Sequence, residues 1–372
     1  MNNKGLSKDD SLCIKGIAIL MLIFHHLYCE VSRFEKFDVD FSPFTQDFVF
    51  DISNIMRICV SIFAFITGYG LLKSIAKTDI DRKSVAKWNI TRLFKTMSGY
   101  YFVFMIYLIV TEIINQYPQE VYFKNGISKG IVYIIIDFLG LGNLFGTPMG
   151  LATWWYMSTV VVFILLVPII YAVSKKIGYL PIVAIIIALP RILNLGYLGG
   201  MNLYTFLLVM VFGMIFSDYD MFEKISAKLP KNKILSFLIS LVFFGGISIG
   251  IYHILTRIDT AKFWEIKYTL LPIFVICLFR YCIIRIPVLK NLLAFLGKYS
   301  MTIFLTHNFI RYVYLNDFTY SFGNFMLIFI VLTVLSVVLA VVIDTLKKAV
   351  KYDKLINKFT AFILKKADNI IK

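Results

Sequence analysis

The chain has 372 residues, of which 59% are hydrophobic and only 16% are charged, and its formal net charge is +16. This composition excludes a soluble globular domain and is typical of a polytopic membrane protein. A charge this positive could indicate nucleic-acid binding, but in a membrane protein the excess of Lys and Arg in cytoplasmic loops explains it without a nucleic-acid partner.

Apolar windows of about 17 to 25 residues, the length that an α-helix needs to cross a bilayer, recur along the chain. We predict an all-α fold with about ten transmembrane helices, at 12–30, 50–72, 96–115, 151–174, 179–196, 202–217, 234–256, 267–285, 299–315 and 324–346. The loops on one side of this arrangement hold most of the Lys and Arg residues, and the first loop on the other side is acidic. Both termini are therefore expected in the cytoplasm of a bacterial cell, with the chain passing several times through the cell membrane.

One apolar segment, 128–147, does not fit as a crossing, because it would move Lys175 and Lys176 to the outside. We expect a re-entrant or interfacial outer helix there, with Asp137 facing a wet cavity. The membrane domain then covers 1–346. Residues 347–372 alternate Lys with apolar residues at helical spacing, which predicts a basic amphipathic cytoplasmic tail on the anionic inner leaflet.

The cysteines are odd in number and lack metal-ligand spacing. We expect free thiols and no metal site from Cys13, Cys29, Cys59, Cys277 and Cys282.

The first predicted span contains ionisable side chains in an apolar stretch, "IKGIAILMLIFHHLY" (14–28). From Lys15 to His26 is about 16 Å along a helix, and the two side chains share one face, whereas His25 belongs to a neighbouring face. Glu30 follows His26 at i+4, within its reach. Lys15 lies near the cytoplasmic surface and His26 in the outer half of the bilayer, so the stripe between them suggests a path across the membrane.

Each of these side chains also has a structural interpretation. Lys15 could anchor the helix at the inner leaflet, and one histidine could bind a backbone carbonyl of a neighbouring helix. Ionisable groups deep in a span usually mark a site, however, and imidazole suits general-base work near neutral pH.

A second cationic stretch is the inner loop 73–101, which leads into the third predicted span with Arg92 and Lys95. These two residues are i and i+3 on a helix and could hold one anionic group together. Most of the positive charge in this loop is explained by topology, but Arg92, Lys95 and Lys15 are candidate phosphate ligands.

Five short elements occur in a characteristic order: Lys15 and His26 in "KGIAILMLIFHH", "SIFAFITGYGLL" (61–72), Arg92-Leu-Phe-Lys95 before "TMSGYY", "TWWYMSTVVVFILLVPII" (153–170) and "LGKYSMTIFLTHNFI" (296–310). Together they resemble the acyltransferase-3 family of integral membrane O-acyltransferases over about 8–345. The family has Arg where this chain has Lys15 and Lys95. Lysine keeps the charge but lacks the planar fork that binds phosphate through two hydrogen bonds.

The resemblance implies transfer of an acyl group, usually acetyl, from cytoplasmic acetyl-CoA to a hydroxyl of a glycan or another surface acceptor. His26 would be the general base, or would itself take the acyl group, with His25 and Glu30 beside it. Lys15, Arg92 and Lys95 would bind the phosphates of the donor. The distance of about 16 Å between Lys15 and His26 suits a donor with phosphates at one end and a thioester at the other.

Other polar groups in the outer half could bind the acceptor: Arg57, Asp137, Trp154, Trp155, Arg191 and His307. The tryptophans suit sugar stacking but equally an aromatic belt. Arg57 needs a partner inside the membrane, for which Glu30 or Asp51 is at a suitable depth. His307 could be structural or catalytic.

The main alternative is a transporter or flippase for a lipid-linked glycan, which would also need many spans and intramembrane charges. Such proteins often show two related halves with broken helices at matching positions, and we find no such symmetry in the sequence. A membrane-bound glycan polymerase would be expected to carry a large outer loop rich in Arg, and the outer region 116–150 has none.

Overall fold

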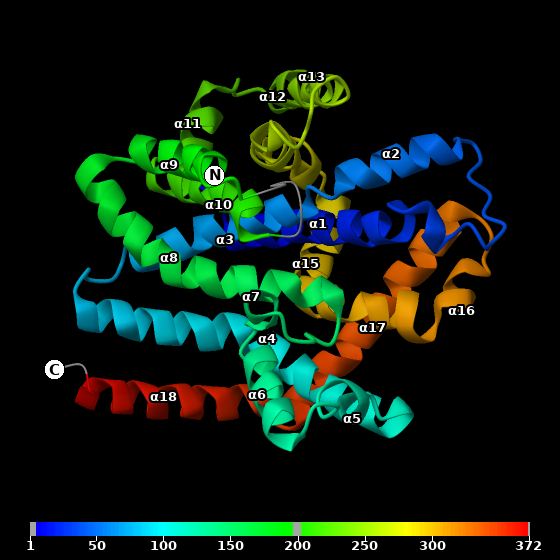
Figure 1. Cartoon of the computed structure of the whole chain (residues 1–372). Coiled ribbons are helices and arrows are strands. Elements are labelled where there is room, and N and C mark those ends of the chain that lie inside the picture. The colour runs from blue at the N-terminus through cyan, green and yellow to red at the C-terminus, as the bar shows by residue number, and fades with distance from the viewer. Residues whose placement is uncertain (1–4, 196–201, 371–372) are drawn as a thin grey trace.

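The computed structural model describes residues 5–195 and 202–370, and within these ranges every regular element is a helix (Figure 1). The prediction of an all-α fold is confirmed. The first helices are α1 (Lys8–Tyr28), α2 (Gln46–Met56), α3 (Cys59–Ile75), α4 (Arg82–Asn115), α5 (Tyr117–Val121), α6 (Ile127–Phe138), α7 (Gly142–Phe145), α8 (Trp155–Ile177) and α9 (Leu180–Ile192). The remaining helices are α10 (Leu203–Asp218), α11 (Met221–Lys228), α12 (Lys233–Ser240), α13 (Gly246–Leu255), α14 (Leu271–Tyr281), α15 (Pro287–Asn308), α16 (Asn316–Tyr320), α17 (Phe325–Ala349) and α18 (Tyr352–Ile370).

Eight helical runs in the described ranges are long and apolar enough to cross a membrane. They are Lys8–Tyr28, Gln46–Ile75, Arg82–Asn115, Ala152–Ile177, Lys233–Leu255, Ile266–Arg285, Pro287–Tyr314 and Phe325–Ala349. The pair α10 and α11 would be a ninth if the two helices, bent by 65°, form one span. The predicted span 179–196 corresponds to α9, whose 13 residues are fewer than a crossing usually needs.

Two helices begin well before the predicted spans. α4 begins at Arg82 instead of 96, where the carboxylate of Asp81 accepts hydrogen bonds from the backbone N–H groups of Lys83 and Ser84. α15 begins at Pro287 instead of 299. A hydropathy window marks only the apolar part of a helix, so it misses a polar extension at the start of that helix.

The segment 128–147 contains α6 and α7, separated by a turn in which Gly140 has a φ of 75°. The 12 residues of α6 extend about 18 Å, too short to cross a hydrocarbon layer of about 30 Å. This length agrees with a segment that does not cross the membrane, and its re-entrant or interfacial position stays a prediction.

Two pairs of helices touch backbone to backbone at glycines. A Cβ at Gly16 of α1 would collide with α15, and a Cβ at Gly297 of α15 would collide with α1. Gly68 of α3 and Gly213 of α10 make a second reciprocal pair. Small residues allow membrane helices to approach closely, and the first pair sets how α1 and α15 cross.

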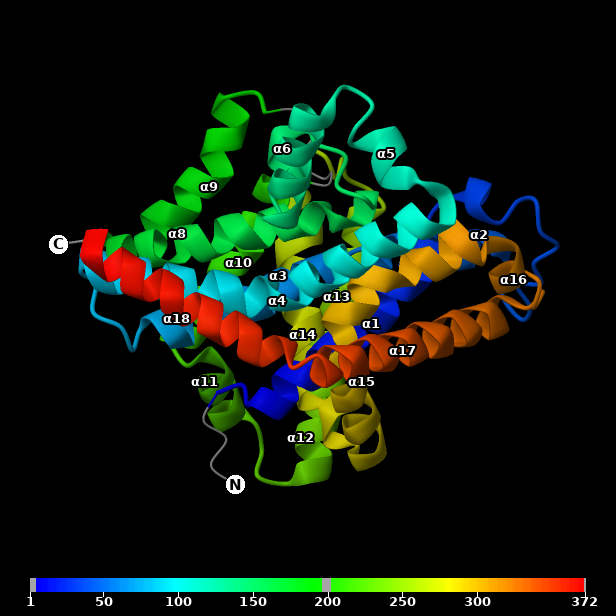
Figure 2. The same ribbon diagram turned by 90° about the horizontal axis from the view of Figure 1, so that it is seen from below.

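The tail helix α18 lies alongside α4 (Figure 2). The ring of Phe359 packs against Phe94 with centroids 5.4 Å apart, and the carboxylate of Asp368 pairs with Lys87 at 2.6 Å and with Lys83 at 3.2 Å. The tail predicted to lie on lipid therefore has a protein partner along part of its length.

Candidate functional site

The helix α1 runs unbroken past Lys15 and both histidines. Its first turn is fixed by Ser7, whose hydroxyl accepts from the N–H of Asp10 while the Asp10 carboxylate accepts from the N–H of Ser7. An unbroken helix keeps Lys15 and His26 on one face, about 16 Å apart along the axis.

Three histidines meet near the C-terminal end of α1. The rings of His26 and His307 have centroids 5.0 Å apart and planes tilted by 35°, and the rings of His25 and His26 have centroids 5.3 Å apart. His307 is fully buried on α15. The close crossing of α1 and α15 thus brings together two histidines that the sequence analysis treated separately.

His25 faces a different helix from His26. Its Nδ1 lies 2.8 Å from the carbonyl oxygen of Ser53 in α2, and the Ser53 hydroxyl donates back to the His25 carbonyl at 3.2 Å. A carbonyl can only accept, so Nδ1 carries the proton and donates. His25 is therefore bound to backbone, while His26 faces the third histidine.

His307 is held in one tautomer by its own helix. Its Nδ1 lies 3.0 Å from the carbonyl oxygen of Ile303 and 2.9 Å from that of Phe304, so Nδ1 must be the donor. The other ring nitrogen, Nε2, then carries a lone pair, and it is buried with no hydrogen-bond partner among the described residues. A buried acceptor that receives no hydrogen bond costs free energy of folding. Such groups are rare unless a ligand or a water molecule donates to them.

Arg33 contacts His26 directly and was not among the predicted site residues. Its Nη1 donates to the carbonyl oxygen of His26 at 2.7 Å and lies 3.4 Å from His26 Nδ1. The same guanidinium binds the carboxylate of Glu30 at 2.9 Å and 3.3 Å. Glu30 follows the end of α1 at Tyr28, so it is off the helix and reaches Arg33 instead of His26.

Arg57 lies where the backbone breaks between α2 and α3. Its expected partners do not bind it. Glu30 is engaged by Arg33, and no described carboxylate forms an ion pair with Arg57. The guanidinium is half-buried and close enough to His25 for its charge to act on that ring.

Asp137 is fully buried and its acceptors are occupied. Its carboxylate accepts from the Tyr122 hydroxyl at 2.6 Å, from the N–H of Met149 at 2.7 Å and from the Thr147 hydroxyl, while its carbonyl accepts from Tyr100 at 2.6 Å. Burial, and then the bond to Asp137, raise the pKa of Tyr122 well above its usual range, so this phenol remains a donor. These contacts give Asp137 a structural role in fixing 117–150.

Both tryptophans are in the protein interior. Trp154 is 2% exposed, and its Nε1–H donates to the carbonyl oxygen of Leu305 at 2.9 Å, two residues before His307. Trp155 is 7% exposed and packs against Phe206 with centroids 5.6 Å apart. In this structure they are therefore neither an aromatic belt nor an open sugar platform, and Trp154 supports the backbone beside His307.

Arg191 binds away from the histidines. It pairs with Glu265 at 2.5 Å and donates to the carbonyl oxygens of Ile187 and Lys262. These contacts join α9 to the turn before α14.

The three predicted phosphate ligands are not joined to one another by any hydrogen bond between described residues. Lys15 is half-buried and has no ion pair there. Arg92 donates to the Ser74 hydroxyl and lies 5.9 Å from the ring of Trp88, while Lys95 is exposed. All three are cations that no described carboxylate binds. Their N–H groups are therefore available as the charged hydrogen-bond donors that phosphates bind.

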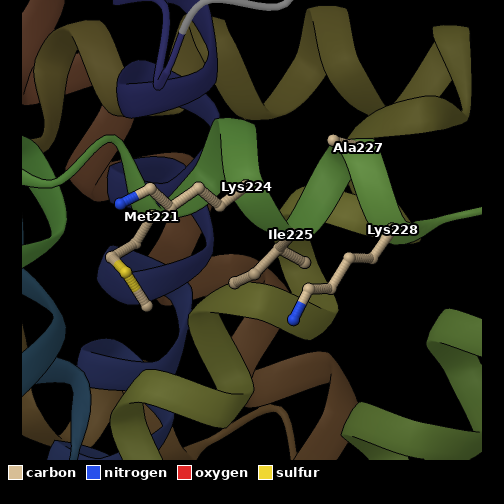
Figure 3. Close-up of a pocket in the computed structure, with 5 residues that line it drawn as sticks. All are labelled: Met221, Lys224, Ile225, Ala227 and Lys228. Atoms are coloured by element: carbon tan, nitrogen blue, oxygen red, sulfur yellow. The ribbon is translucent and has the colours of Figure 1, made fainter.

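Two surface hollows lie elsewhere. One of about 380 Å³ is lined by α11, with the side chains of Lys224 and Lys228 at its edge (Figure 3). Another of about 520 Å³ lies between the end of α9 and residues 261–264. Neither contains a histidine. Within the described ranges, no group of three or more His, Cys, Asp or Glu side chains could hold a metal ion.

A model of the acyltransferase-3 family, described as an acyltransferase domain, matches residues 12–345. No curated protein and no solved structure matches the chain.

Proposed function

Because the chain belongs to the acyltransferase-3 family, we propose that it moves an acetyl group from cytoplasmic acetyl-CoA to a hydroxyl of a glycan or other surface acceptor. The acceptor would reach the protein from the outer side of a bacterial cytoplasmic membrane. The observation that carries the proposal is the histidine cluster near one end of α1, with Lys15 near the other end of the same helix.

His26 is the general base. The Arg33 guanidinium can only donate, so the facing Nδ1 of His26 carries the lone pair. At 3.4 Å this contact is long for a hydrogen bond, and an acceptor hydroxyl could replace it. Nδ1 then takes the hydroxyl proton as the oxygen attacks the acyl carbon.

His307 stabilises the resulting imidazolium. Nε2 of His26 carries a proton throughout, and protonation of Nδ1 makes this N–H a stronger donor, for which the bare Nε2 of the neighbouring His307 supplies an acceptor. His25, bound to Ser53, fixes the rotation of the helix end. Arg33 positions the base by holding its backbone carbonyl.

Acetyl-CoA supplies the activated thioester when it is bound. Lys15, Arg92 and Lys95 hold its phosphates, and its acetyl end has to reach His26 near the other end of α1. The sulfur leaves as a thiolate and accepts a proton, so the proton taken by His26 can return through solvent or through the leaving group.

Acetyl-CoA turnover and coenzyme A binding test this function together. Purified protein should transfer or slowly hydrolyse the acetyl group, and coenzyme A should raise its melting temperature. Arg92→Ala should weaken that stabilisation, while Arg82→Ala, an exposed cation at the start of the same helix, should not. Absence of turnover together with absence of coenzyme A binding would favour the transporter or flippase alternative.

A further inference from the structure

Arg33 has hydrogen-bond donors that its contacts do not use. A guanidinium carries five N–H groups. Its Nε and Nη2 lie 3.3 Å and 2.9 Å from the carboxylate oxygens of Glu30, and its Nη1 lies 2.7 Å from the carbonyl oxygen of His26. The second N–H of Nη1 has only the long contact of 3.4 Å with His26 Nδ1, and within the described ranges the second N–H of Nη2 has no acceptor. Two N–H groups therefore remain beside the proposed base.

The orientation of the guanidinium is fixed from two sides. Glu30 binds it through two parallel hydrogen bonds, and the carbonyl of His26 holds Nη1. Paired bonds between Arg and a carboxylate restrict the plane of the guanidinium as well as its position. The Arg33 side chain is 19% exposed and that of Glu30 is 61% exposed, so the cation is the more enclosed partner. The unused N–H groups are therefore held next to His26.

The loop that carries Arg33 is held against the end of α1. The N–H of Arg33 donates to the carbonyl oxygen of Glu30 at 3.1 Å, which closes a short turn. The next residue, Phe34, is 2% exposed, and its ring packs against Tyr28 of α1 at 5.9 Å and against Phe41 at 5.4 Å. A donor that the fold already holds in place needs no rearrangement when charge develops during a reaction.

A structural role explains only part of this arrangement. Because α1 ends at Tyr28, the carbonyl oxygen of His26 is among the last four of the helix, which have no partner within it. Arg33 donates to this oxygen and so caps the helix. The cap uses one N–H group and the pair with Glu30 uses two. Neither contact accounts for the two donors that remain.

The proposed reaction needs a donor close to His26. When the hydroxyl oxygen bonds to the acetyl carbon, its proton passes to Nδ1 and an electron pair of the C=O bond moves onto the carbonyl oxygen. The C=O bond then re-forms as the C–S bond breaks, and the thiolate leaves and accepts a proton. Between these two steps the oxygen carries a negative charge, and N–H groups placed to bind it lower the barrier.

Neither neighbouring histidine can supply that donor. The Nδ1–H of His25 is bound to the carbonyl oxygen of Ser53, and the Nδ1–H of His307 is bound to carbonyl oxygens of its own helix. A neutral imidazole has one N–H group, so the Nε2 of each ring is an acceptor. Arg33, in contrast, has two N–H groups to offer and a positive charge.

We propose that Arg33 is the oxyanion donor: N–H groups of Nη1 and Nη2 bind the carbonyl oxygen of the acetyl group while the hydroxyl held at His26 Nδ1 attacks its carbon. The attacking oxygen and the oxyanion are bonded to the same carbon, so the donor must lie within a few ångström of the base, as Nη1 does. Both His26 and Arg33 are partly exposed, so substrates can reach them. This inference rests on the proposed function, because it adds a catalytic residue to that reaction.

Hydrolysis of labelled acetyl-CoA by the purified full-length protein tests this role, with water as the attacking molecule. Arg33→Met removes every N–H group of the side chain, and Arg33→Gln keeps an amide N–H that can still cap His26. Each variant, confirmed as folded by its melting temperature, should lower kcat about 100-fold and leave the KM for acetyl-CoA unchanged, because the lost bond forms only in the transition state. Lys36→Met removes an exposed cation from the same loop and should hydrolyse at the wild-type rate.

A binding measurement separates oxyanion stabilisation from helix capping. The trifluoromethyl ketone analogue of acetyl-CoA takes up water at its carbonyl carbon and so resembles the tetrahedral intermediate. The wild type should bind this analogue about tenfold or more tightly than coenzyme A, and Arg33→Gln should bind the two equally. If both Arg33 variants lost kcat but kept the preference for the analogue, Arg33 would be a helix cap alone and the proposal would be wrong.

The two measurements also distinguish the role of Arg33 from the proposed function. A wild type that hydrolyses acetyl-CoA, with the same kcat in folded Arg33→Gln, would overturn the role of Arg33 and leave the function standing. A wild type without turnover would contradict the function. In that case, a preference for the analogue that Arg33→Gln loses would still support the oxyanion site, and equal binding of the analogue and coenzyme A by the wild type would overturn it.

Discussion

His26 of α1 and His307 of α15 lie ring against ring, with centroids 5.0 Å apart. The two residues are far apart in the chain, and the backbone contact of their helices at Gly16 and Gly297 places them together. One ring nitrogen of His307 is engaged by its own helix, and the other has no partner in the part of the chain that the structure describes. This pairing connects the packing of the protein to its proposed chemistry.

Replacing His307 by Phe distinguishes a functional from a structural histidine. Phe fills a similar space and removes a buried acceptor that lacks a donor, so stability should be unchanged or higher. If His307 stabilises the imidazolium of His26, acetyl transfer should fall about 100-fold. The measurements are the initial rate of transfer and the melting temperature.

The matched control is His253→Phe on α13, where the histidine is exposed and outside the cluster. Both the rate and the melting temperature of this variant should stay near those of the wild type. A His307→Phe protein that transfers at the wild-type rate but melts earlier would assign His307 to structure alone.

Gly16→Ala should separate the two histidines. The new Cβ would collide with the backbone of α15, and overpacking of this kind costs about 1 to 3 kcal/mol. We expect a lower melting temperature and a lower transfer rate. Gly246→Ala is the control, because no atom lies near enough to meet its Cβ, and it should melt no earlier than the wild type. Equal behaviour of the two variants would contradict the close crossing of α1 and α15.

Asp137→Asn should destabilise the segment 117–150 without changing the chemistry. The amide presents N–H donors to the hydroxyl and N–H groups that now donate to the carboxylate, and a buried mismatch costs about 1 to 3 kcal/mol. The melting temperature should fall while KM for the acceptor stays constant. Asp38→Asn, at an exposed site, should do neither. If Asp137→Asn changed the KM for the acceptor but left the melting temperature unchanged, Asp137 would be a substrate-binding residue and not a structural one.

The contact between α18 and α4 should depend on the charge of Asp368. Hydrogen bonds from Lys87 and Lys83 hold the pKa of this carboxyl below its usual value. A lowered pKa in the folded state means that the contact is stabilised above the ordinary carboxyl pKa of about 3.9 and loses that stabilisation as the pH falls through the lower, folded value. Asp368→Asn removes the charge at neutral pH.

The rate of amide hydrogen exchange in 352–370 at pH 7 measures the stability of this contact. Exchange should be faster in Asp368→Asn than in the wild type and unchanged in Lys365→Gln. Lys365 is an exposed residue of the same helix and forms no ion pair with any described residue. Identical exchange in all three proteins would show that the ion pairs do not hold the tail.

The sequence was sufficient where a single helix decides the geometry. An apolar run with Lys15 and His26 eleven positions apart predicts their shared face, because the pitch of an α-helix is fixed. The same rule predicts that His25 and His26 have different neighbours, as observed. It also explains the error at Glu30, where the i+4 rule was applied beyond the end of the helix.

The rest of the site depends on tertiary packing and loop conformation, which periodicity does not encode. Nothing in the spacing of Arg33 shows that its loop folds back onto His26. Glycines at 16 and 297 predict close helix contacts but not which helices meet. The sequence indicated a belt or a sugar platform for Trp154, and its burial follows from the contact of the turn Ala152–Trp154 with α15, where the indole N–H donates to the carbonyl oxygen of Leu305.

The central claim is that His26 is the base and His25 supports it. The most direct test is acetyl transfer from labelled acetyl-CoA by His26→Ala and His25→Ala, each confirmed as folded by its melting temperature and by coenzyme A binding. We predict a loss of about 100-fold or more for His26→Ala and a smaller loss for His25→Ala. Full activity of a folded His26→Ala protein, or a larger loss in His25→Ala, would contradict the claim.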